Sequence, residues 1–324
     1  MRVVIPVAGA GTRLKPHTHS QPKALLHVAG KPIISHLLDP IVKLDPEEVI
    51  FIIGFRGDMI EDFVRRNFSF KSTFVTQEKL HGLGYALNLA IRDINDGDLL
   101  VLLGDTIVEC DLHKFIKAGE NVLGLRQVDD PRRFGVAVVE NDRVVQLEEK
   151  PEKPRSNLAI IGLYYFNDIA PLKRALGGHV ESGKTTRGEI QFTDALQGMI
   201  EQGASFSPYE VQEWFDCGKK ETMLSTNKHL VASINQSPKL QNSAVIPPVY
   251  VHPNATVANS VLGPNVSISE GSAVRDSIIR NSIIGCNTTV DNMILEDSLL
   301  GNEVRLRGNS QVLNLGESSE VNPA

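Results

Sequence analysis

A glycine-rich segment near the start of the chain has the residue types that most directly indicate chemistry. Gly9 and Gly11 follow an apolar run at residues 2–7, and Arg13 stands two places after the second glycine. Glycines directly after a strand let backbone N–H groups approach phosphate oxygens, and a nearby cation offsets the phosphate charge. Lys23 follows at a spacing that brings a second cation over the same loop. These residues predict a phosphate-binding loop.

Other common sites are excluded by spacing. A Rossmann dinucleotide fingerprint has the form G-x-G-x-x-G, but the residue three after Gly11 is Leu14. The nine histidines include no pair with zinc-like helical spacing. The three cysteines, Cys110, Cys217 and Cys286, form no CxxC pair, so neither a disulfide framework nor a structural zinc site is predicted.

Length and composition limit the classes of protein that the chain can belong to. It has 324 residues, 41% of them hydrophobic and 22% charged, so at roughly 150 residues per domain we expect two globular domains. The longest apolar runs, such as residues 49–54, are far shorter than the roughly 20 residues of a membrane-spanning helix. The first run is too short and glycine-rich for a secretory signal, which predicts a cytoplasmic protein. The net charge of −6 argues against a general nucleic-acid binder.

The first two thirds of the chain must position the phosphate loop. Short apolar runs alternate there with amphipathic stretches, which is typical of βαβ units around a parallel sheet. Residues around Asn141 and Asp142 alternate instead, which predicts a hairpin of strands 134–140 and 143–149 outside the parallel core. We predict a Rossmann-like, mostly parallel α/β domain over residues 1–240, with strands at 2–7, 49–54, 72–76 and 99–104 and helices at 31–44, 58–67, 82–94 and 219–234.

Residues 241–324 have a different composition, with many Asn, Ser and Gly around single aliphatic residues. A six-residue period of aliphatic residues is typical of the hexapeptide repeat of a left-handed parallel β-helix. Each aliphatic residue fills a narrow triangular core, and small polar residues or glycines form the corners. Coils of about eighteen residues would number about four, enough for a solenoid to bury a core. The period relates Val251 to Val257, Ile268 to Val274, Ile278 to Ile284 and Val290, and Leu300 to Leu306 and Val312.

The phosphate loop resembles the signature of a known enzyme family, the nucleoside triphosphate:sugar-1-phosphate nucleotidylyltransferases, or sugar-nucleotide pyrophosphorylases. The resemblance lies in GAGTRLKP at residues 9–16, PKALL at 22–26 and KP at 31–32. It extends to about residue 221, and a bacterial or archaeal subset of the family also has a C-terminal hexapeptide β-helix. It implies an enzyme that makes an NDP-sugar and pyrophosphate from a nucleoside triphosphate and a sugar-1-phosphate.

The resemblance also implies the site residues. Asp105 and Asp216 are the implied Mg²⁺ ligands, and Arg13, Lys23 and Asp105 are the implied catalytic residues. Sugar-phosphate binding is implied for Gly135, Glu149, Lys150, Gly162 and Glu189. Nucleotide binding is implied for Ala8, Gly9, Ala10, Gly11, Thr12, Arg13, Lys23, Gln77 and Gly82.

Electrostatics explains why this reaction needs several cations. A phosphate oxygen must approach the α-phosphorus, and two unit charges 4 Å apart repel by about 4 kcal/mol at an effective dielectric constant of 20. Arg13, Lys23, Lys150 and Mg²⁺ together would lower that barrier. The nucleophile is already an anion, so neither a general base nor a covalent enzyme intermediate is expected.

The substrates are less sharply indicated than the reaction. Gln77 and the following glycines favour dTTP or UTP, and glucose-1-phosphate is the commonest sugar in that branch. Pro22-Lys23-Ala24 stands where the thymidylyl branch usually has Ser-Lys-Gln, which argues against dTTP. GTP with mannose-1-phosphate is the alternative pair. We also expect a homo-oligomer without membrane or nucleic-acid partners.

Three other functions are weighed against this one. Residues 178–185 match G-x-x-x-x-G-K-T, the P-loop pattern, but the residues before them predict a helix rather than a strand, so we expect a mobile polar loop near the sugar pocket. A β-helix acyltransferase activity is disfavoured because the repeats after His252 contain no histidine. A regulatory protein with a dead site would lack Arg13, Lys23, Asp105 or Asp216, and all four are present.

Overall fold

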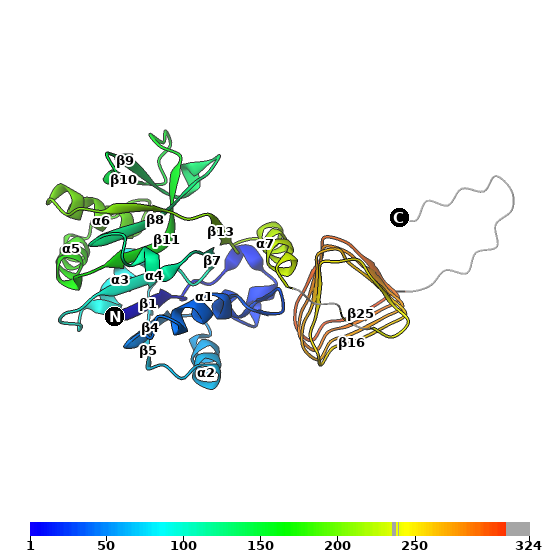
Figure 1. Ribbon diagram of the computed structural model, residues 1–324. Coiled ribbons are helices and arrows are strands. Elements are labelled where there is room, and N and C mark those ends of the chain that lie inside the picture. Colours follow the sequence, from blue (N-terminus) through cyan, green and yellow to red (C-terminus); the bar gives the residue numbers. More distant parts are fainter. Residues whose placement is uncertain (235–237, 239, 309–324) are drawn as a thin grey trace. The chain divides into compact units, whose positions relative to one another are not determined.

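A computed structural model of the chain describes residues 1–234, 238 and 240–308 (Figure 1). It divides into two compact units. Unit 1 comprises Met1–His27 and Lys31–Thr226, and unit 2 comprises Val28–Gly30 and the chain from Asn227 onward. None of the helices in the described ranges has both the length and the apolar character that crossing a membrane requires.

Unit 1 is built on a nine-stranded mixed sheet. Its parallel centre has β1 (Arg2–Pro6) between β4 (Glu48–Ile53) and β6 (Leu99–Leu102), with β5 (Ser72–Thr76) at the edge. The continuous apolar runs predict all four of these strands, and the prediction is confirmed. The sheet is completed by three strands that the sequence analysis does not identify, β8 (Asn121–Gln127), β11 (Leu158–Phe166) and β12 (Ser207–Glu210).

The predicted hairpin forms the antiparallel end of this sheet. It consists of β9 (Gly135–Glu140) and β10 (Arg143–Glu149), and β9 also pairs antiparallel with β11. Asn141 and Asp142 have φ values of 50° and 57°, as a two-residue type I′ turn requires. The hairpin therefore lies outside the parallel core, as predicted.

Two layers of helices cover the sheet (Figure 1). One apolar core joins it to α3, α5 and α6, and a second core joins the opposite face to α1, α2 and α4. The helix expected at residues 31–44 begins two residues later because Lys31–Pro32 forms β3, which pairs with β2 (His27–Val28). The helices span Ile33–Val42 (α1), Gly57–Asn67 (α2), Leu83–Ile91 (α3), Leu112–Phe115 (α4), Ile169–Ser182 (α5), Phe192–Glu201 (α6) and Lys220–Ala232 (α7).

The described part of unit 2 contains three parallel sheets of four short strands each, which form a stack of triangular coils (Figure 1). This arrangement is that of a left-handed parallel β-helix and confirms the predicted fold and coil number. The sheets consist of β14 (Ala244–Val245), β17 (Val261–Leu262), β20 (Ile278–Ile279) and β23 (Ile294–Leu295); of β15 (Val249–Val251), β18 (Val266–Ile268), β21 (Ile283–Ile284) and β24 (Leu299–Leu300); and of β16 (Thr256–Ala258), β19 (Ala273–Arg275), β22 (Thr289–Asp291) and β25 (Arg305–Arg307).

The coils are shorter than expected, and one predicted core residue is wrong. Ile268 pairs with Val251 on one side and Ile284 on the other, so coils span seventeen or sixteen residues rather than eighteen. The difference arises because the step from Val274 to the next core residue is five residues, which places Ile279 in the core instead of Ile278. Val312 lies outside the described residues.

Asparagines occupy the corners of the coils, as the composition predicts. Asn242, Asn259, Asp276 and Asn292 recur at one corner, all with φ between 47° and 55°. Asparagine and aspartate tolerate this left-handed conformation better than other non-glycine residues. Their side chains also form a ladder, in which Asn242 donates to Asn259 and Asn259 donates to Asp276.

Candidate active site

A cavity of about 390 Å³ lies at the carboxyl ends of the parallel strands of unit 1. Ligands of open α/β sheets bind at this edge. Ala8 follows β1 and Asp105 follows β6, so both reach the cavity from the ends of neighbouring strands. The cavity brings together residues that the resemblance implies for the site: Ala8, Gly9, Gly11, Thr12, Arg13, Lys23, Gln77, Gly82, Asp105 and Glu189. Ala10 belongs to the same loop.

The glycine-rich loop has the geometry of an anion site. Gly11 adopts φ 59°, and a Cβ there would lie 2.9 Å from Cγ2 of Thr18 and 3.1 Å from Cβ of Lys23. Thr18 is buried, and its hydroxyl donates to the Gly11 carbonyl over 2.9 Å. In the described part of the chain, no group accepts a hydrogen bond from the N–H groups of Gly9, Ala10 and Gly11. These donors are available to phosphate oxygens.

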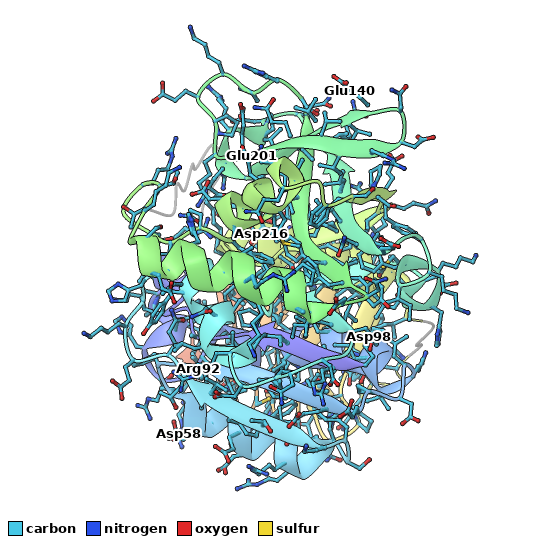
Figure 2. All side chains as sticks on the ribbon, turned by 90° about the vertical axis from the view of Figure 1, so that its left-hand side faces the viewer. Asp58, Arg92, Asp98, Glu140, Glu201 and Asp216 are labelled. Atoms are coloured by element: carbon cyan, nitrogen blue, oxygen red, sulfur yellow. The ribbon has the colours of Figure 1, made fainter. Side chains whose placement is uncertain are left out.

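A buried lysine lies between two aspartates on one side of this cavity. The side chain of Lys23 is only 9% exposed, and its Nζ lies 2.9 Å from Oδ2 of Asp105 and 3.9 Å from Oδ1 of Asp216. Burial of an ammonium group is costly unless carboxylates compensate its charge. Asp216 is near the centre of the view in Figure 2, whereas Asp58 and Glu140 lie at its edges. Lys23, Asp105 and Asp216 thus form one charged cluster.

A small second sheet brings Asp216 to Asp105. Strand β7 (Thr106–Glu109) directly follows Asp105 and pairs antiparallel with β13 (Glu213–Asp216), where Asp216 is opposite Thr106. The backbone N–H of Cys217 donates to the carbonyl of Asp105 over 3.2 Å. The pairing therefore joins two carboxylates that are far apart in the sequence, and it is missing from the sequence analysis.

The two aspartates fit a divalent cation. Both carboxylates converge on one ammonium group, so they already bind a cation at this position. Within the described ranges, no group of three or more His, Cys, Asp and Glu side chains is placed to hold a metal by itself. Mg²⁺ commonly takes one or two carboxylates and completes its shell with water and substrate phosphates. The donor set matches that use.

Gly218 belongs to the site, although the sequence analysis does not assign it. It lines the cavity, and a Cβ there would lie 2.8 Å from both Nη2 of Arg13 and Oδ1 of Asp216. The guanidinium of Arg13 and the carboxylate of Asp216 therefore both approach the backbone at Gly218. Its position two residues after Asp216 is the only sequence signal for this role, and glycine alone leaves room for both groups.

Gln77 and Gly82 form another wall of the cavity. Gln77 is buried, and its N–H donates to the carbonyl of Ile53 at the end of β4 over 2.8 Å. Gly82 has φ 104°, and a Cβ there would lie 2.6 Å from the carbonyl oxygen of Ile190 and 2.9 Å from Cβ of Glu189. Glu189 therefore lies beside Gly82 in the same cavity. Leu80, which is 60% exposed, completes this wall.

Glu149 and Lys150 form a second charged group at the end of the hairpin. The side chain of Glu149 is 9% exposed, and its carboxylate accepts a 2.6 Å hydrogen bond from the Thr193 hydroxyl and lies 3.1 Å from Nζ of Lys150. A Cβ at Gly135 would lie 3.1 Å from both the Glu149 carboxylate and the Thr193 hydroxyl. The negative charge of Glu149 adds to burial in raising the pKa of Tyr164. Gly135 of β9, Thr193 of α6 and Lys150, which directly follows β10, thus surround the Glu149 carboxylate.

Gly162 has a structural place in β11 rather than a place in the cavity lining. The register of β11 against β8 shifts between Ile160 and Tyr164, and Gly162 adopts φ 83° within that shift. Its carbonyl accepts the N–H of Leu103 over 2.9 Å, and a Cβ would lie 2.6 Å from Cγ of Leu103. Leu103 precedes Gly104 and Asp105, so Gly162 supports the segment that carries the aspartate.

Cys217 lacks the low thiol pKa of a nucleophile, and the segment at residues 178–185 lacks the structure of a P-loop. Burial raises the pKa of the Cys217 thiol to about 12, which keeps it protonated and unreactive at neutral pH. Residues 178–182 are the last part of helix α5, which Gly183 ends with φ 63°. The P-loop reading is therefore excluded, and the mobile loop expected at 178–185 is wrong for its helical half. The buried residues Leu172 and Leu176 belong to the same helix, which continues to Ser182.

Comparison with known proteins agrees with this geometry. The chain is 31% identical over 346 residues to the bifunctional protein GlmU of Methanococcus aeolicus, covering 97% of this chain and 81% of that protein. It is 28% identical over 342 residues to a glucose-1-phosphate thymidylyltransferase of Streptomyces griseus, covering 96% and 95% of the two chains. Among solved structures, a Bacillus anthracis protein described as a glucose-1-phosphate thymidylyltransferase has a TM-score of 0.62 and 29% identity, covering 74% of this chain and 98% of its own.

The match to a protein family covers most of the chain. Residues 2–233 match the nucleotidyl transferase family, and this range contains the phosphate loop, Lys23 and both aspartates. The cavity is lined by a glycine-rich loop and lies beside two carboxylates, an arrangement compatible with nucleotidyl transfer. The chain therefore belongs to the nucleotidyl transferase family.

Proposed function

We propose that the chain transfers a nucleotidyl group from a nucleoside triphosphate to a sugar-1-phosphate, releasing pyrophosphate. The observation that carries the proposal is the cluster of Lys23, Asp105 and Asp216 beside a loop with free N–H groups. This cluster can hold a polyphosphate and a divalent cation next to each other. The family membership and the names of the relatives support the same reaction.

Each part of the site has a proposed task. The N–H groups of residues 9–11 and the guanidinium of Arg13 bind the phosphates of the triphosphate. Asp105 and Asp216 hold Mg²⁺, which neutralises phosphate charge when bound. Glu149 accepts hydrogen bonds from sugar hydroxyls, and Lys150 pairs with the sugar phosphate. Catalysis consists of positioning and charge stabilisation, so the protein supplies no covalent intermediate.

The proposed substrates are dTTP or UTP with glucose-1-phosphate. The buried Gln77 supports a pyrimidine because its amide can pair with the edge of the base, and Gly82 leaves room for the base against the backbone. The Streptomyces griseus relative is named for glucose-1-phosphate and thymidylyl transfer, which supports the same pair. GTP with mannose-1-phosphate is the alternative pair.

We propose that residues 1–240 carry out nucleotidyl transfer and that the β-helix has a supporting role. The name of the Methanococcus aeolicus relative, a bifunctional protein, keeps a second activity in the β-helix as the alternative. Acyl transfer is the alternative activity, and acetyl-CoA is the reagent that tests it.

One assay tests the proposal. Pyrophosphate release is measured with dTTP, UTP, GTP, CTP and ATP, each with glucose-1-phosphate or mannose-1-phosphate, in Mg²⁺ and in EDTA. We expect release with one pyrimidine triphosphate and glucose-1-phosphate, and loss of release in EDTA. Release with GTP and mannose-1-phosphate alone would establish the alternative pair. A lack of pyrophosphate release with every pair, together with turnover of acetyl-CoA, would contradict the proposal.

A further inference from the structure

A buried asparagine in unit 2 joins three segments of the chain. Asn227 lies in α7 and is 0% exposed. Its Oδ1 accepts hydrogen bonds from the N–H of Ala29 over 3.0 Å and from the hydroxyl of Ser267 over 2.8 Å. Its Nδ2 donates to the carbonyl of Asn265 over 3.1 Å. The amide is thus held in one orientation by the β-helix and binds the backbone of residue 29.

The segment that Asn227 holds is the tip of the β2–β3 hairpin. Val28 and Ala29 are buried, and Ala29 has φ 48°. Gly30 has φ 87°, and a Cβ there would overlap the ring of Tyr250 in β15. An asparagine amide and an aromatic ring therefore pack against this short tip, and both partners belong to unit 2, as the tip does.

The tip is a direct continuation of the segment that carries Lys23. Lys23 begins the short 3₁₀ helix Lys23–Leu25, and the N–H of Leu26 donates to the carbonyl of Lys23 over 3.0 Å. The N–H of Ile33 then donates to the carbonyl of Leu26 over 2.9 Å, which closes the base of the hairpin. A short, hydrogen-bonded stretch of chain therefore joins the tip to Lys23.

Asn227 is connected to Asp216 in a similar way. Cys217 directly follows Asp216, and its thiol donates over 3.9 Å to the hydroxyl of Thr226, the residue before Asn227. The segment of Lys23 thus continues to Ala29, and the segment of Asp216 contacts Thr226, the neighbour of Asn227. Ala29 and Asn227 are hydrogen-bonded to each other. A cation and a carboxylate that must keep a fixed separation gain from such a common support.

We propose that Asn227 is a positioning residue for nucleotidyl transfer, through which the β-helix fixes the segments of Lys23 and Asp216. This inference rests on the proposed function. Asn227 does not touch substrate, so its contribution is to the placement of the Lys23 ammonium group. A misplacement of about 1 Å in such a site costs on the order of 100-fold in rate. The β-helix then serves catalysis as a rigid support without binding a substrate of its own.

Two matched serine substitutions test the inference. Ser267→Ala removes a hydrogen bond to Asn227, and Ser267 is 0% exposed. Ser272→Ala is the control, since Ser272 is 1% exposed and its hydroxyl donates to the carbonyl of Gly285 over 2.6 Å inside the β-helix. Asn227→Ala completes the set. In the full chain, kcat, both KM values, Tm and amide hydrogen exchange of residues 28–30 are measured.

We expect Asn227→Ala to lower kcat at least tenfold and Ser267→Ala at least threefold, with faster exchange at residues 28–30. Ser272→Ala should lower Tm as Ser267→Ala does but keep kcat and exchange within twofold of wild type. KM for the sugar phosphate should change less than twofold in all three, because Glu149 and Lys150 are carried by other elements. If Asn227→Ala fails to fold, the comparison of Ser267→Ala with Ser272→Ala tests the inference.

Two results would overturn the inference while leaving the proposed function intact. One is an active wild-type enzyme whose kcat is unchanged by Ser267→Ala and Asn227→Ala. The other is an equal loss of kcat in Ser272→Ala, which would indicate general destabilisation of the β-helix. A wild-type chain that turns over no pair of substrates would instead remove the proposed function, and this inference with it.

Discussion

Lys23 and its two aspartates determine the charge of the site. The Lys23 ammonium group is largely removed from water, and Asp105 at 2.9 Å compensates most of its charge. Asp105 itself is 47% exposed, so it faces both the lysine and the space where a ligand binds. Asp216 lies 3.9 Å from the same ammonium group and is 21% exposed. The carboxylates therefore balance the charge of Lys23 in the folded state, and they are also the proposed ligands of Mg²⁺.

Asp105→Asn is expected to abolish turnover and to lower stability moderately. The amide keeps the shape of the side chain but removes the charge that a divalent cation needs, so we expect kcat to fall on the order of 100-fold or more. The variant leaves the buried Lys23 ammonium group with Asp216 at 3.9 Å as its remaining carboxylate, so we expect a loss of about 1 to 3 kcal/mol from the free energy of unfolding. Pyrophosphate release and thermal unfolding measure the two effects.

The control for this substitution is Asp58→Asn. Asp58 lies in the first turn of α2 at the periphery of the molecule (Figure 2). The same change of charge there should leave kcat within twofold of wild type. Near-normal turnover of Asp105→Asn would refute the assignment of Asp105 as a metal ligand.

At the scale of elements, irregular backbone positions the site. The parallel strands β1 and β6 end at the cavity, but the residues that act there lie in the turns after them. The bulge in β11 at Gly162 supports Leu103, and the short β7–β13 pairing brings Asp216 beside Asp105. Gly104 approaches β1 closely, since its N–H donates to the carbonyl of Pro6 over 3.1 Å. Small departures from regular strands thus set the separation of the two carboxylates.

Gly162→Ala should impair turnover through this bulge. A Cβ would lie 2.6 Å from Cγ of Leu103, in a backbone conformation with φ 83° that alanine rarely adopts. We expect a loss of about 2 to 4 kcal/mol in unfolding free energy and at least a tenfold lower kcat because Asp105 moves with Leu103. Urea unfolding and the pyrophosphate assay measure these changes.

Gly203→Ala separates backbone strain from this contact. Gly203 also has positive φ, 94°, but a Cβ there meets nothing within 4 Å. The variant should lose about 1 kcal/mol from strain and keep the kcat of wild type. If the two variants lose equal stability and both remain fully active, the contact between Gly162 and Leu103 has no role in the site.

At the scale of the whole molecule, the three faces of the β-helix differ. The face of β15, β18, β21 and β24 includes Ser267, which is buried against Asn227. The face of β16, β19, β22 and β25 has charged residues such as Arg275 and Asp291. The remaining face has a row of residues in register at the first position of each strand, Ala244, Val261, Ile278 and Ile294. Ile294 is 76% exposed.

We propose that this row contributes to self-association of the chain. A flat aliphatic row buries its surface when it meets a copy of itself, as an isologous dimer contact requires. Ile294→Glu should therefore lower the molar mass measured by light scattering after gel filtration. Thr289→Glu, an exposed position on the charged face, is the control and should leave the mass unchanged. A monomeric wild type, or an Ile294→Glu variant of wild-type mass, would contradict the proposal.

The sequence by itself determined the local features of this protein. Strong, continuous apolar runs predict β1, β4, β5 and β6 correctly. A parallel strand that is covered on both faces is a continuous apolar run, which can be identified without knowing its neighbours. The phosphate loop is local too, since Gly9, Gly11 and Arg13 are neighbours in the chain. The coils of the β-helix follow from periodicity, although the five-residue steps displaced Ile278 from its predicted core position.

Only the tertiary structure decided which distant residues meet. Strand β13 is short and half-buried, so no periodicity in the sequence indicates that it pairs with β7 and places Asp216 beside Lys23. Gly218 and Asn227 have no motif, and their places follow from what surrounds them. Hydrogen bonds and steric limits between remote segments depend on distances that a linear sequence does not contain. The glycine-rich loop could therefore be identified from the sequence, whereas the arrangement of its partners required the fold.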